Sequence, residues 1–401
     1  MINKNKEKFS PYLPDSWLLS LVISFLLLFV WEYLRIIYGF KLFDPGFGVV
    51  ALGFVVCFIL NCFYFIKILI ARSWVRDPMF VVFLLSFFVI VFLLPIYARD
   101  RLQEYFLKYF NIALSYALMC LIGIRLSDVN LRKKYHIYFF AFLFGFYFFA
   151  LNFVPDGEYV AFFLLGGSSV THHAYAASIL FVAMFSVLFL EKKWMIIFFI
   201  ASGIVLIING SRADFLGLVV FVFFYIPGVI KRSLIIFGLL FLMIIFNYAG
   251  LIPDRFLEML DLGVSPSYLA RQKLQDYGMT VIANNIFWGD IGYQIYIDKY
   301  GSYMHNILSI WSQYGVLAFL CFVILMMRPV CFFYRYRYFE IAKFGFAFGI
   351  AMIFLISSAK SFVWTYPAIY WGFYLGVRSN FIRSRKNASH RNNYFTCSIA
   401  S

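Results

Sequence analysis

Residues 79–98 read MFVVFLLSFFVIVFLLPIYA, a run that contains no charged side chain. A helix of about 20 apolar residues is long enough to cross the hydrocarbon core of a bilayer. Comparable runs recur along most of the chain, and we expect about twelve membrane-spanning helices in all. The runs lie near residues 17–38, 47–70, 79–98, 107–126, 136–154, 173–190, 194–210, 214–230, 234–252, 305–327, 342–358 and 361–379.

The composition supports the same fold class. Of the 401 residues 64% are hydrophobic and 13% are charged, whereas soluble domains are about half apolar and about a quarter charged. A cytosolic enzyme, a secreted disulfide scaffold and a disordered protein are therefore excluded. The six cysteines lie mostly in or beside apolar runs without paired spacing, which favours reduced thiols. We predict an all-α polytopic membrane protein, with a helical domain over 1–379 and a disordered cytoplasmic tail over 380–401.

The positive charge indicates the orientation. The chain has 34 Lys and Arg against 19 Asp and Glu, a formal net charge of +15. Most of the basic residues fall at the N-terminus, in the C-terminal tail and in alternate loops, and cytoplasmic loops are enriched in Lys and Arg. We therefore expect both termini in the cytoplasm, and contact with anionic lipid rather than nucleic acid. The longest loop, 253–304, then lies on the periplasmic side, and the apolar spacing in 268–286 predicts an amphipathic helix within it.

Two basic residues in short outer hairpins depart from this orientation rule. Arg212 lies in the tight segment 209–214, with sequence NGSRAD, at the expected mouth of the helix bundle. It is either a functional cation or an interfacial arginine paired with Asp214, and we favour the first. Lys360, in the second short outer hairpin, has the same two interpretations.

Histidines lie at the start of two predicted spans, on the outer side of the membrane. His305 and Asn306 follow the long loop that contains Arg271. They could simply cap a helix, but an imidazole at this surface can also accept a proton from a hydroxyl at neutral pH. His172 and His173 begin another span, and adjacent histidines on a helix cannot both face one metal ion. For this pair we favour capping and substrate contact.

Signatures of metal and cofactor sites are missing from the sequence. It has no Gly-rich phosphate loop, no Asp-x-Asp motif, and no His, Cys and Glu cluster with zinc spacing. We therefore expect no metal and no cofactor. Acidic residues within the predicted spans are rare, which argues against a proton-coupled transporter.

Four stretches in a fixed order carry a resemblance to a known family. They are 168–178 with its paired histidines, 208–214, the region from 268 to 293, and 305–317 with His305 and Gly315. Together with the twelve-span layout, they resemble the O-antigen ligase and O-antigen polymerase superfamily of bacterial inner-membrane glycosyltransferases. The chain has Asn285-Ile286 where that family often has Asn-Pro.

The resemblance implies a reaction and roles for residues. The family transfers a glycan from undecaprenyl diphosphate, a lipid in the outer leaflet, to a sugar hydroxyl without a metal ion. Arg212 and Arg271 would bind the donor diphosphate, because paired guanidinium groups neutralise its charge. His305 would deprotonate the acceptor hydroxyl, and a single displacement would invert the anomeric configuration. His173 and Lys360 would help orient the diphosphate, and Asn306 would be a further substrate contact.

The two enzyme alternatives, a ligase and a polymerase, differ in the acceptor. In an O-antigen ligase the acceptor is a sugar of lipid A-core in lipopolysaccharide biosynthesis, and in a polymerase it is a second lipid-linked glycan. The paired-histidine stretch and the His305 region favour the ligase. A polysaccharide or lipid exporter would share the spans and the basic charge, but it needs a polar pathway, and the predicted spans are too uniformly apolar to supply one.

Overall fold

The computed structural model describes residues 77–102, 105–127, 172–188, 192–208, 211–248, 266–296 and 304–381. All of them belong to one compact unit, formed by Leu69–Leu164 and Ser168–Ser401. The predicted spans near 17–38, 47–70 and 136–154 lie outside the described residues, as does the tail beyond residue 381.

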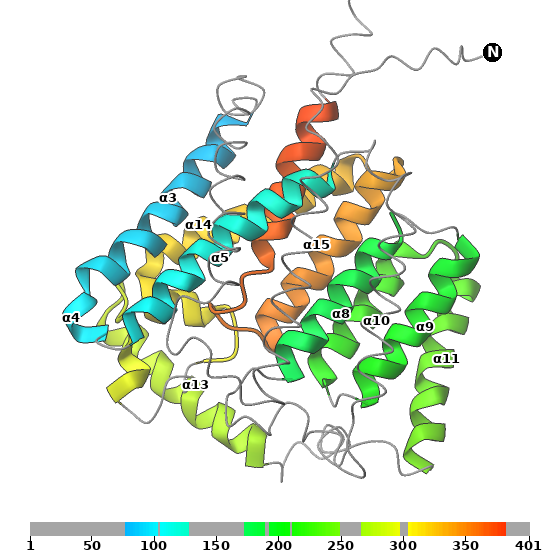
Figure 1. The fold of residues 1–401 in the computed structure, drawn as a ribbon, viewed down its shortest axis with the longest axis horizontal. Helices are drawn as coiled ribbons and strands as arrows, with labels where there is room; N and C mark the ends of the chain where they lie inside the picture. Colours follow the sequence, from blue (N-terminus) through cyan, green and yellow to red (C-terminus); the bar gives the residue numbers. More distant parts are fainter. Residues whose placement is uncertain are drawn as a thin grey trace, which may run out of the picture. The chain divides into compact units, whose positions relative to one another are not determined.

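Helices account for the regular structure of the described residues, and no strand occurs among them (Figure 1). The helix over 367–381 is called the C-terminal helix below. The remaining elements are α3 (Pro78–Tyr97), α4 (Arg99–Leu102), α5 (Phe106–Leu126), α8 (His172–Ser186), α9 (Lys192–Ile208), α10 (Arg212–Tyr225), α11 (Val229–Tyr248), α13 (Pro266–Asn284), η3 (Tyr293–Tyr296), α14 (Leu308–Arg335) and α15 (Glu340–Ser358).

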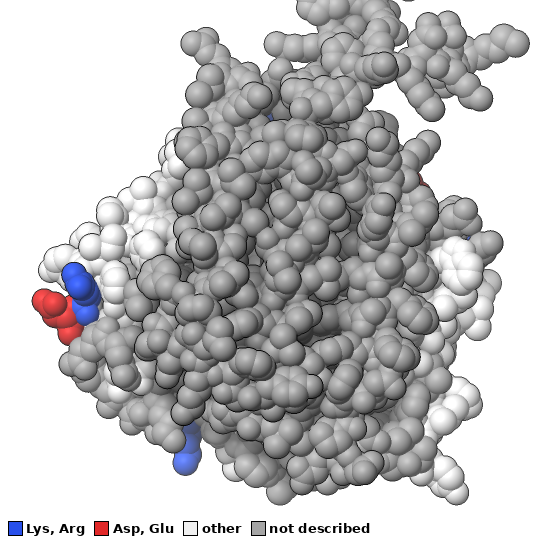
Figure 2. All heavy atoms as spheres, in the orientation of Figure 1, with Lys and Arg blue, Asp and Glu red and all other residues white. Residues whose placement is uncertain are grey.

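Three of these helices are long and apolar enough to cross a membrane: α3, α14 and α15. Two shorter apolar helical segments, Ile112–Ile124 and Trp194–Ile207, lie within α5 and α9. The exposed surfaces of α3 and α11 carry large apolar side chains, such as Leu93 at 58% exposure and Phe237 at 68%. On the face shown in Figure 2, most of the visible described residues are uncharged, while basic and acidic side chains meet at the position of α4. These features are those of an all-helical membrane protein.

Close backbone contacts hold the C-terminal helix against α5. An added Cβ at Gly372 would lie 1.8 Å from the Cys120 carbonyl oxygen, and one at Gly376 would lie 1.7 Å from the Ser127 hydroxyl. Two glycines four residues apart form one face of a helix, and they let two helices approach closely. Trp371, which is fully buried, fills the adjacent space and stacks on Tyr116 at a centroid distance of 5.8 Å.

At one end of the bundle, a buried carboxylate links three helices by hydrogen bonds. Asp77 precedes α3 and accepts a hydrogen bond from the Phe80 backbone N–H at 3.3 Å. Arg328 of α14 donates to both of its oxygens, at 2.6 and 2.9 Å, and Tyr374 of the C-terminal helix donates to one of them. Burial alone would raise the pKa of Asp77, but these donors and the nearby Arg378 lower it overall. The charged network therefore joins three helices at their shared end.

The long apolar helices run between this end and an opposite end. In Figure 1, α15 (orange) runs from top to bottom, a loop over 359–366 follows, and the C-terminal helix (red) returns upward. The helix expected over 268–286 is present as α13, which lies at the lower end, while its amphipathic character stays a prediction. The first turn of α10 meets the 359–366 loop through the contact of Asp214 with Lys360. The candidate functional residues therefore gather at the end opposite Asp77.

Candidate functional site

A kink in α14 supports one wall of the site. The sequence predicted a continuous span over 305–327, but Gly315 has φ 80° and ψ 175° and interrupts the helix. The turn after α13 enters this break: Val316 N–H donates to the Ile286 carbonyl at 3.1 Å, and Asp290 N–H donates to the Ser312 carbonyl at 2.7 Å. Broken helices are tolerated at membrane depth only where protein groups satisfy the freed backbone, and here the turn does so.

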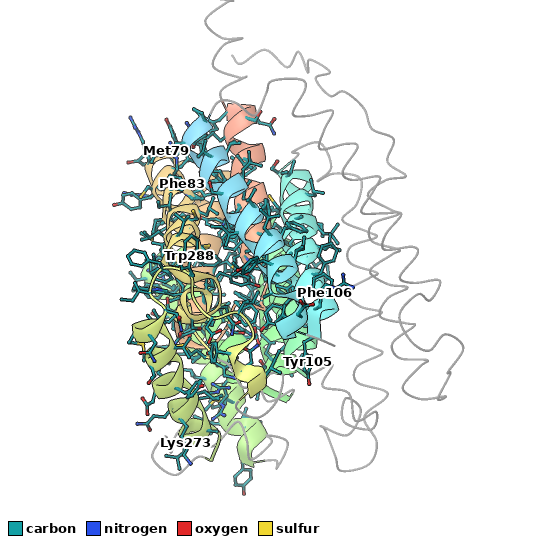
Figure 3. All side chains as sticks on the ribbon, turned by 90° about the vertical axis from the view of Figure 1, so that its left-hand side faces the viewer. Met79, Phe83, Tyr105, Phe106, Lys273 and Trp288 are labelled. Carbon is teal, nitrogen blue, oxygen red and sulfur yellow. The ribbon has the colours of Figure 1, made fainter. Side chains whose placement is uncertain are left out.

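Glycine is required on both sides of this contact. A Cβ at Gly315 would lie 2.1 Å from the Phe287 carbonyl oxygen, and a Cβ at Gly289 would lie 2.5 Å from the Gly315 nitrogen. The tip of the turn is exposed, with Trp288 at 79% exposure. Figure 3 shows Trp288 between Met79, near one end of the helices, and Lys273, near the other. The turn therefore presents an aromatic side chain part of the way along the apolar helices.

A closed ring of hydrogen bonds fixes the residues that follow the turn. Tyr109 of α5 donates to the Gln313 side-chain oxygen at 3.1 Å, Gln313 donates to the Gln294 side-chain oxygen at 2.5 Å, and Gln294 donates back to Tyr109. The Gly292 N–H adds a fourth bond, to Gln313, at 2.9 Å. All three side chains are fully buried. A buried polar network whose members are satisfied rigidifies its surroundings, so this ring locks α5, η3 and α14 together.

His305 lies on the short segment between the long loop and α14, and its neighbours fix that segment. The Asn306 side-chain oxygen accepts the Leu308 N–H at 3.0 Å, and its amide donates to Gln275 of α13. Met304 is fully buried against Gly278 of α13. The helix-capping interpretation therefore applies to Asn306, and a substrate contact by Asn306 remains a prediction.

The imidazole of His305 is held in its neutral form. Burial lowers its pKa, and the positive charges of Arg271 and Lys360 lower it further, to about 4. Desolvation and nearby cations both disfavour the imidazolium ion. At neutral pH His305 is therefore a neutral imidazole, in a field that favours anions.

Lys360 pairs with a carboxylate across a long sequence separation. Its ammonium lies 2.8 Å from Oδ2 of Asp214, in the first turn of α10, and the Lys360 side chain is only 8% exposed. The Ser211 hydroxyl donates to the same oxygen at 2.5 Å, so this N-cap residue does not cap its helix in the usual way. The interpretation in which Asp214 pairs with Arg212 is wrong, because its partners are Lys360 and Ser211.

The remaining candidates lie near the same helix ends. Arg212 is the first residue of α10, is partly exposed, and forms no ion pair within the described part of the chain. Arg271 lies in α13 and is partly buried. His172 and His173 begin α8, as the span assignment predicted, but their side chains fall outside the described set.

The structure brings together three of the predicted site residues, Arg271, His305 and Lys360. Sequence reasoning gave no functional role to Asp214, which the structure joins to them. The Ser-x-x-Asp spacing of 211–214 was a usable signal, because it places a hydroxyl and a carboxylate on one helical turn. Among the described residues, no group of three or more His, Cys, Asp or Glu side chains is placed to hold a metal ion.

The fold and the site define the chain only at the level of class, as an all-helical membrane protein with a basic cluster around a neutral histidine. In comparisons with known proteins, no family model, no curated protein and no solved structure matches the chain.

Proposed function

We propose that the chain is a glycosyltransferase of the O-antigen ligase type, which moves a glycan from undecaprenyl diphosphate to a sugar hydroxyl of lipid A-core. The single observation that carries the proposal is the neutral His305 held near two cations, Arg271 and Lys360, at one end of an apolar bundle. Group transfer from a lipid diphosphate needs these parts together: a proton acceptor, positive charge for the leaving group, and access from the bilayer.

The diphosphate leaving group is the part of the reaction that most needs its negative charge stabilised. Arg271 and Arg212 are proposed to bind the diphosphate, because each guanidinium can form two parallel hydrogen bonds to phosphate oxygens. Lys360 is less suited to that role, since Asp214 already neutralises it at 2.8 Å. The first turn of α10 adds backbone N–H groups that favour an anion beside Arg212. In this mechanism the two arginines neutralise the charge of the departing diphosphate.

His305 is proposed to be the general base. Its low pKa makes it a weak base in the absence of substrate, because the surrounding cations oppose protonation. A bound diphosphate would offset that positive charge and raise the pKa of His305. The base therefore gains strength when the donor is in place, and the acceptor hydroxyl loses its proton as it attacks the anomeric carbon. One displacement of this kind inverts the anomeric configuration.

The proposal places the site on the periplasmic side of a bacterial inner membrane, with both chain termini in the cytoplasm. The basic residues Arg335 and Lys343 then lie at the cytoplasmic end, as the distribution of charge favours. A polymerase that joins two lipid-linked glycans would use the same groups with a different acceptor. Supplying purified lipid A-core or a second lipid-linked glycan as the acceptor separates these two activities.

The test is glycan transfer by the purified protein from an undecaprenyl-diphosphate donor. Arg271→Lys and Arg212→Lys keep the charge but lose the planar fork, and we expect transfer to fall by orders of magnitude. His305→Ala should lower the rate about 10²- to 10⁴-fold while donor binding persists. The matched control is Lys273→Ala, which removes an exposed cation from the same helix as Arg271. Normal transfer by His305→Ala at the wild-type protein level would exclude the proposed base.

A further inference from the structure

Two buried polar atoms near Lys360 have no hydrogen-bond partner in the part of the chain that the structure describes. They are the Oδ1 oxygen of Asp214, an acceptor, and the Nε1–H group of Trp364, a donor. Asp214 is fully buried and Trp364 is 8% exposed. Buried polar groups in folded proteins are nearly always satisfied, so each unsatisfied group requires an explanation. Here one acceptor and one donor occur beside the same cation.

Lys360 links the two atoms in space. Its ammonium lies 2.8 Å from Oδ2 of Asp214 and 5.5 Å from the centre of the Trp364 ring. The side chains reach this point from the start of α10 and from the loop over 359–366. Trp364 is supported from behind by Phe181 of α8, at a centroid distance of 6.3 Å. The Asp214 carboxylate and the Trp364 ring therefore both lie beside the Lys360 ammonium.

We propose that Asp214, Lys360 and Trp364 form a subsite for a sugar, and that its hydroxyl groups satisfy the two unpaired atoms. A hydroxyl both donates and accepts, so it can give its proton to Asp214 Oδ1 and accept from the indole N–H or the ammonium. The apolar face of a sugar ring also suits an aromatic side chain. A neutral group suits these side chains better than an anion, because the Asp214 carboxylate already balances the charge of Lys360.

The subsite extends the proposed function and rests on it for the identity of the sugar. The charge of Lys360 lowers the pKa of His305, so a sugar bound here lies within electrostatic range of the proposed base. On the proposed function, the occupant would be the donor sugar that is attached to the diphosphate. This reassigns Lys360 from orienting the diphosphate to contacting a neutral, hydroxyl-rich group.

Binding of simple glycosides tests the subsite without any transfer reaction. The probes are a panel of methyl glycosides of common hexoses and N-acetylhexosamines, and binding to the full-length protein in detergent is followed by saturation-transfer NMR. Trp364→Phe keeps an aromatic ring but removes the donor, and we expect about tenfold weaker binding, the effect of one lost hydrogen bond. Asp214→Asn replaces the charged acceptor and should weaken binding at least as much.

The matched control is Tyr370→Phe. Tyr370 also has a buried hydroxyl without a hydrogen-bond partner, but it packs against Phe333 and Phe348, away from Lys360. This variant should bind the glycosides as the wild type does. Deoxy analogues of the best probe locate the contact. The analogue that lacks the critical hydroxyl should bind the wild type less tightly than the parent glycoside does. In Trp364→Phe, the analogue and the parent glycoside should bind equally well.

Two results would overturn the subsite. One is the absence of binding by the wild type to every glycoside in the panel, and the other is unchanged affinity in Trp364→Phe, which would mean that buried water satisfies the two atoms. Because these measurements use no lipid donor, they remain separate from the proposed transfer reaction. Loss of transfer in His305→Ala with unchanged glycoside affinity in Trp364→Phe would uphold the transferase and remove the subsite.

Discussion

Replacing Gly278 with alanine should displace the segment that carries His305. An alanine Cβ at this position would lie 2.1 Å from the Met304 sulfur and 2.3 Å from its Cγ. Carbon atoms pack at about 3.5–4.0 Å, so the Met304 side chain must move by more than about 1 Å. Met304 is fully buried. Because Cγ is only two bonds from Cα, the adjustment begins next to the backbone that leads into His305.

The expected effect is larger on catalysis than on folding. Overpacking a buried contact costs about 1–3 kcal/mol in the free energy of unfolding. A displacement of about 1 Å in a catalytic group lowers the rate about 10²-fold. Transfer from the lipid-linked donor and thermal unfolding of the purified protein are therefore measured together. The control is Gly238→Ala in α11, where an added Cβ meets nothing within 4 Å and transfer should persist.

A second variant shows whether the contact with Met304 is the cause. Met304→Ala combined with Gly278→Ala removes the atoms that clash, so transfer should partly recover relative to Gly278→Ala alone. Wild-type turnover by Gly278→Ala would refute the reasoning, because His305 would then not depend on this contact. Equal loss in Gly278→Ala and in the double variant would show that α13 itself, rather than Met304, is disturbed.

Three further predictions concern protonation and the kink. In a protein with His305 as its single histidine, the Cε1 resonance should titrate near pH 4 and at higher pH in Arg271→Gln; an ordinary midpoint of about 6.5 would contradict the electrostatic description. The variant needs glutamine at His136, His172, His173 and His390. Gly315→Ala should lower the unfolding temperature by several degrees, because alanine disfavours φ 80° and its Cβ would meet the Phe287 carbonyl; an unchanged temperature would show that the kink relaxes. Because the pKa of Asp77 is lowered, its stabilisation is present above the ordinary pKa of about 4 and is lost as the pH falls through the lowered value. Asp77→Asn should therefore show a smaller loss of stability at acid pH in unfolding scans. A pH profile unchanged from that of the wild type would contradict this description.

The sequence was sufficient to predict the long helices. The run over 79–98 corresponds to α3 (Pro78–Tyr97) within one residue, because a charge-free apolar stretch of that length has a helix as its stable form in a bilayer. The kink in α14 could not be found in this way, since hydropathy is continuous through Gly315. It depends on the tertiary contact with Gly289, and only the presence of glycine at both positions hinted at it.

The residue patterns predicted separate candidates, and only the family resemblance joined them in one reaction. His305 and Lys360 were selected by their places near predicted outer ends and Arg271 by its place in the long outer loop, and helix topology brings such segments together. The pairing of Asp214 with Lys360 was missed, because these residues are 146 positions apart and no local pattern records the contact. Proximity in the sequence instead suggested Arg212 as the partner of Asp214. Arg212 lies only two residues before Asp214, and side chains two residues apart do not face each other on a helix.

Asp77 and Asp214, the two buried carboxylates among the described residues, differ in how their oxygens are hydrogen-bonded. Both oxygens of Asp77 accept hydrogen bonds, and its donors come from α3, α14 and the C-terminal helix. A carboxylate saturated in this way fixes helices and has no acceptor left for a ligand. Asp214 receives both of its donors, Lys360 and Ser211, on one oxygen and leaves the other buried and unpaired. Leaving that acceptor unsatisfied costs stability, and binding of a hydroxyl would recover the cost, which makes the Asp214 end of the bundle the one suited to a substrate.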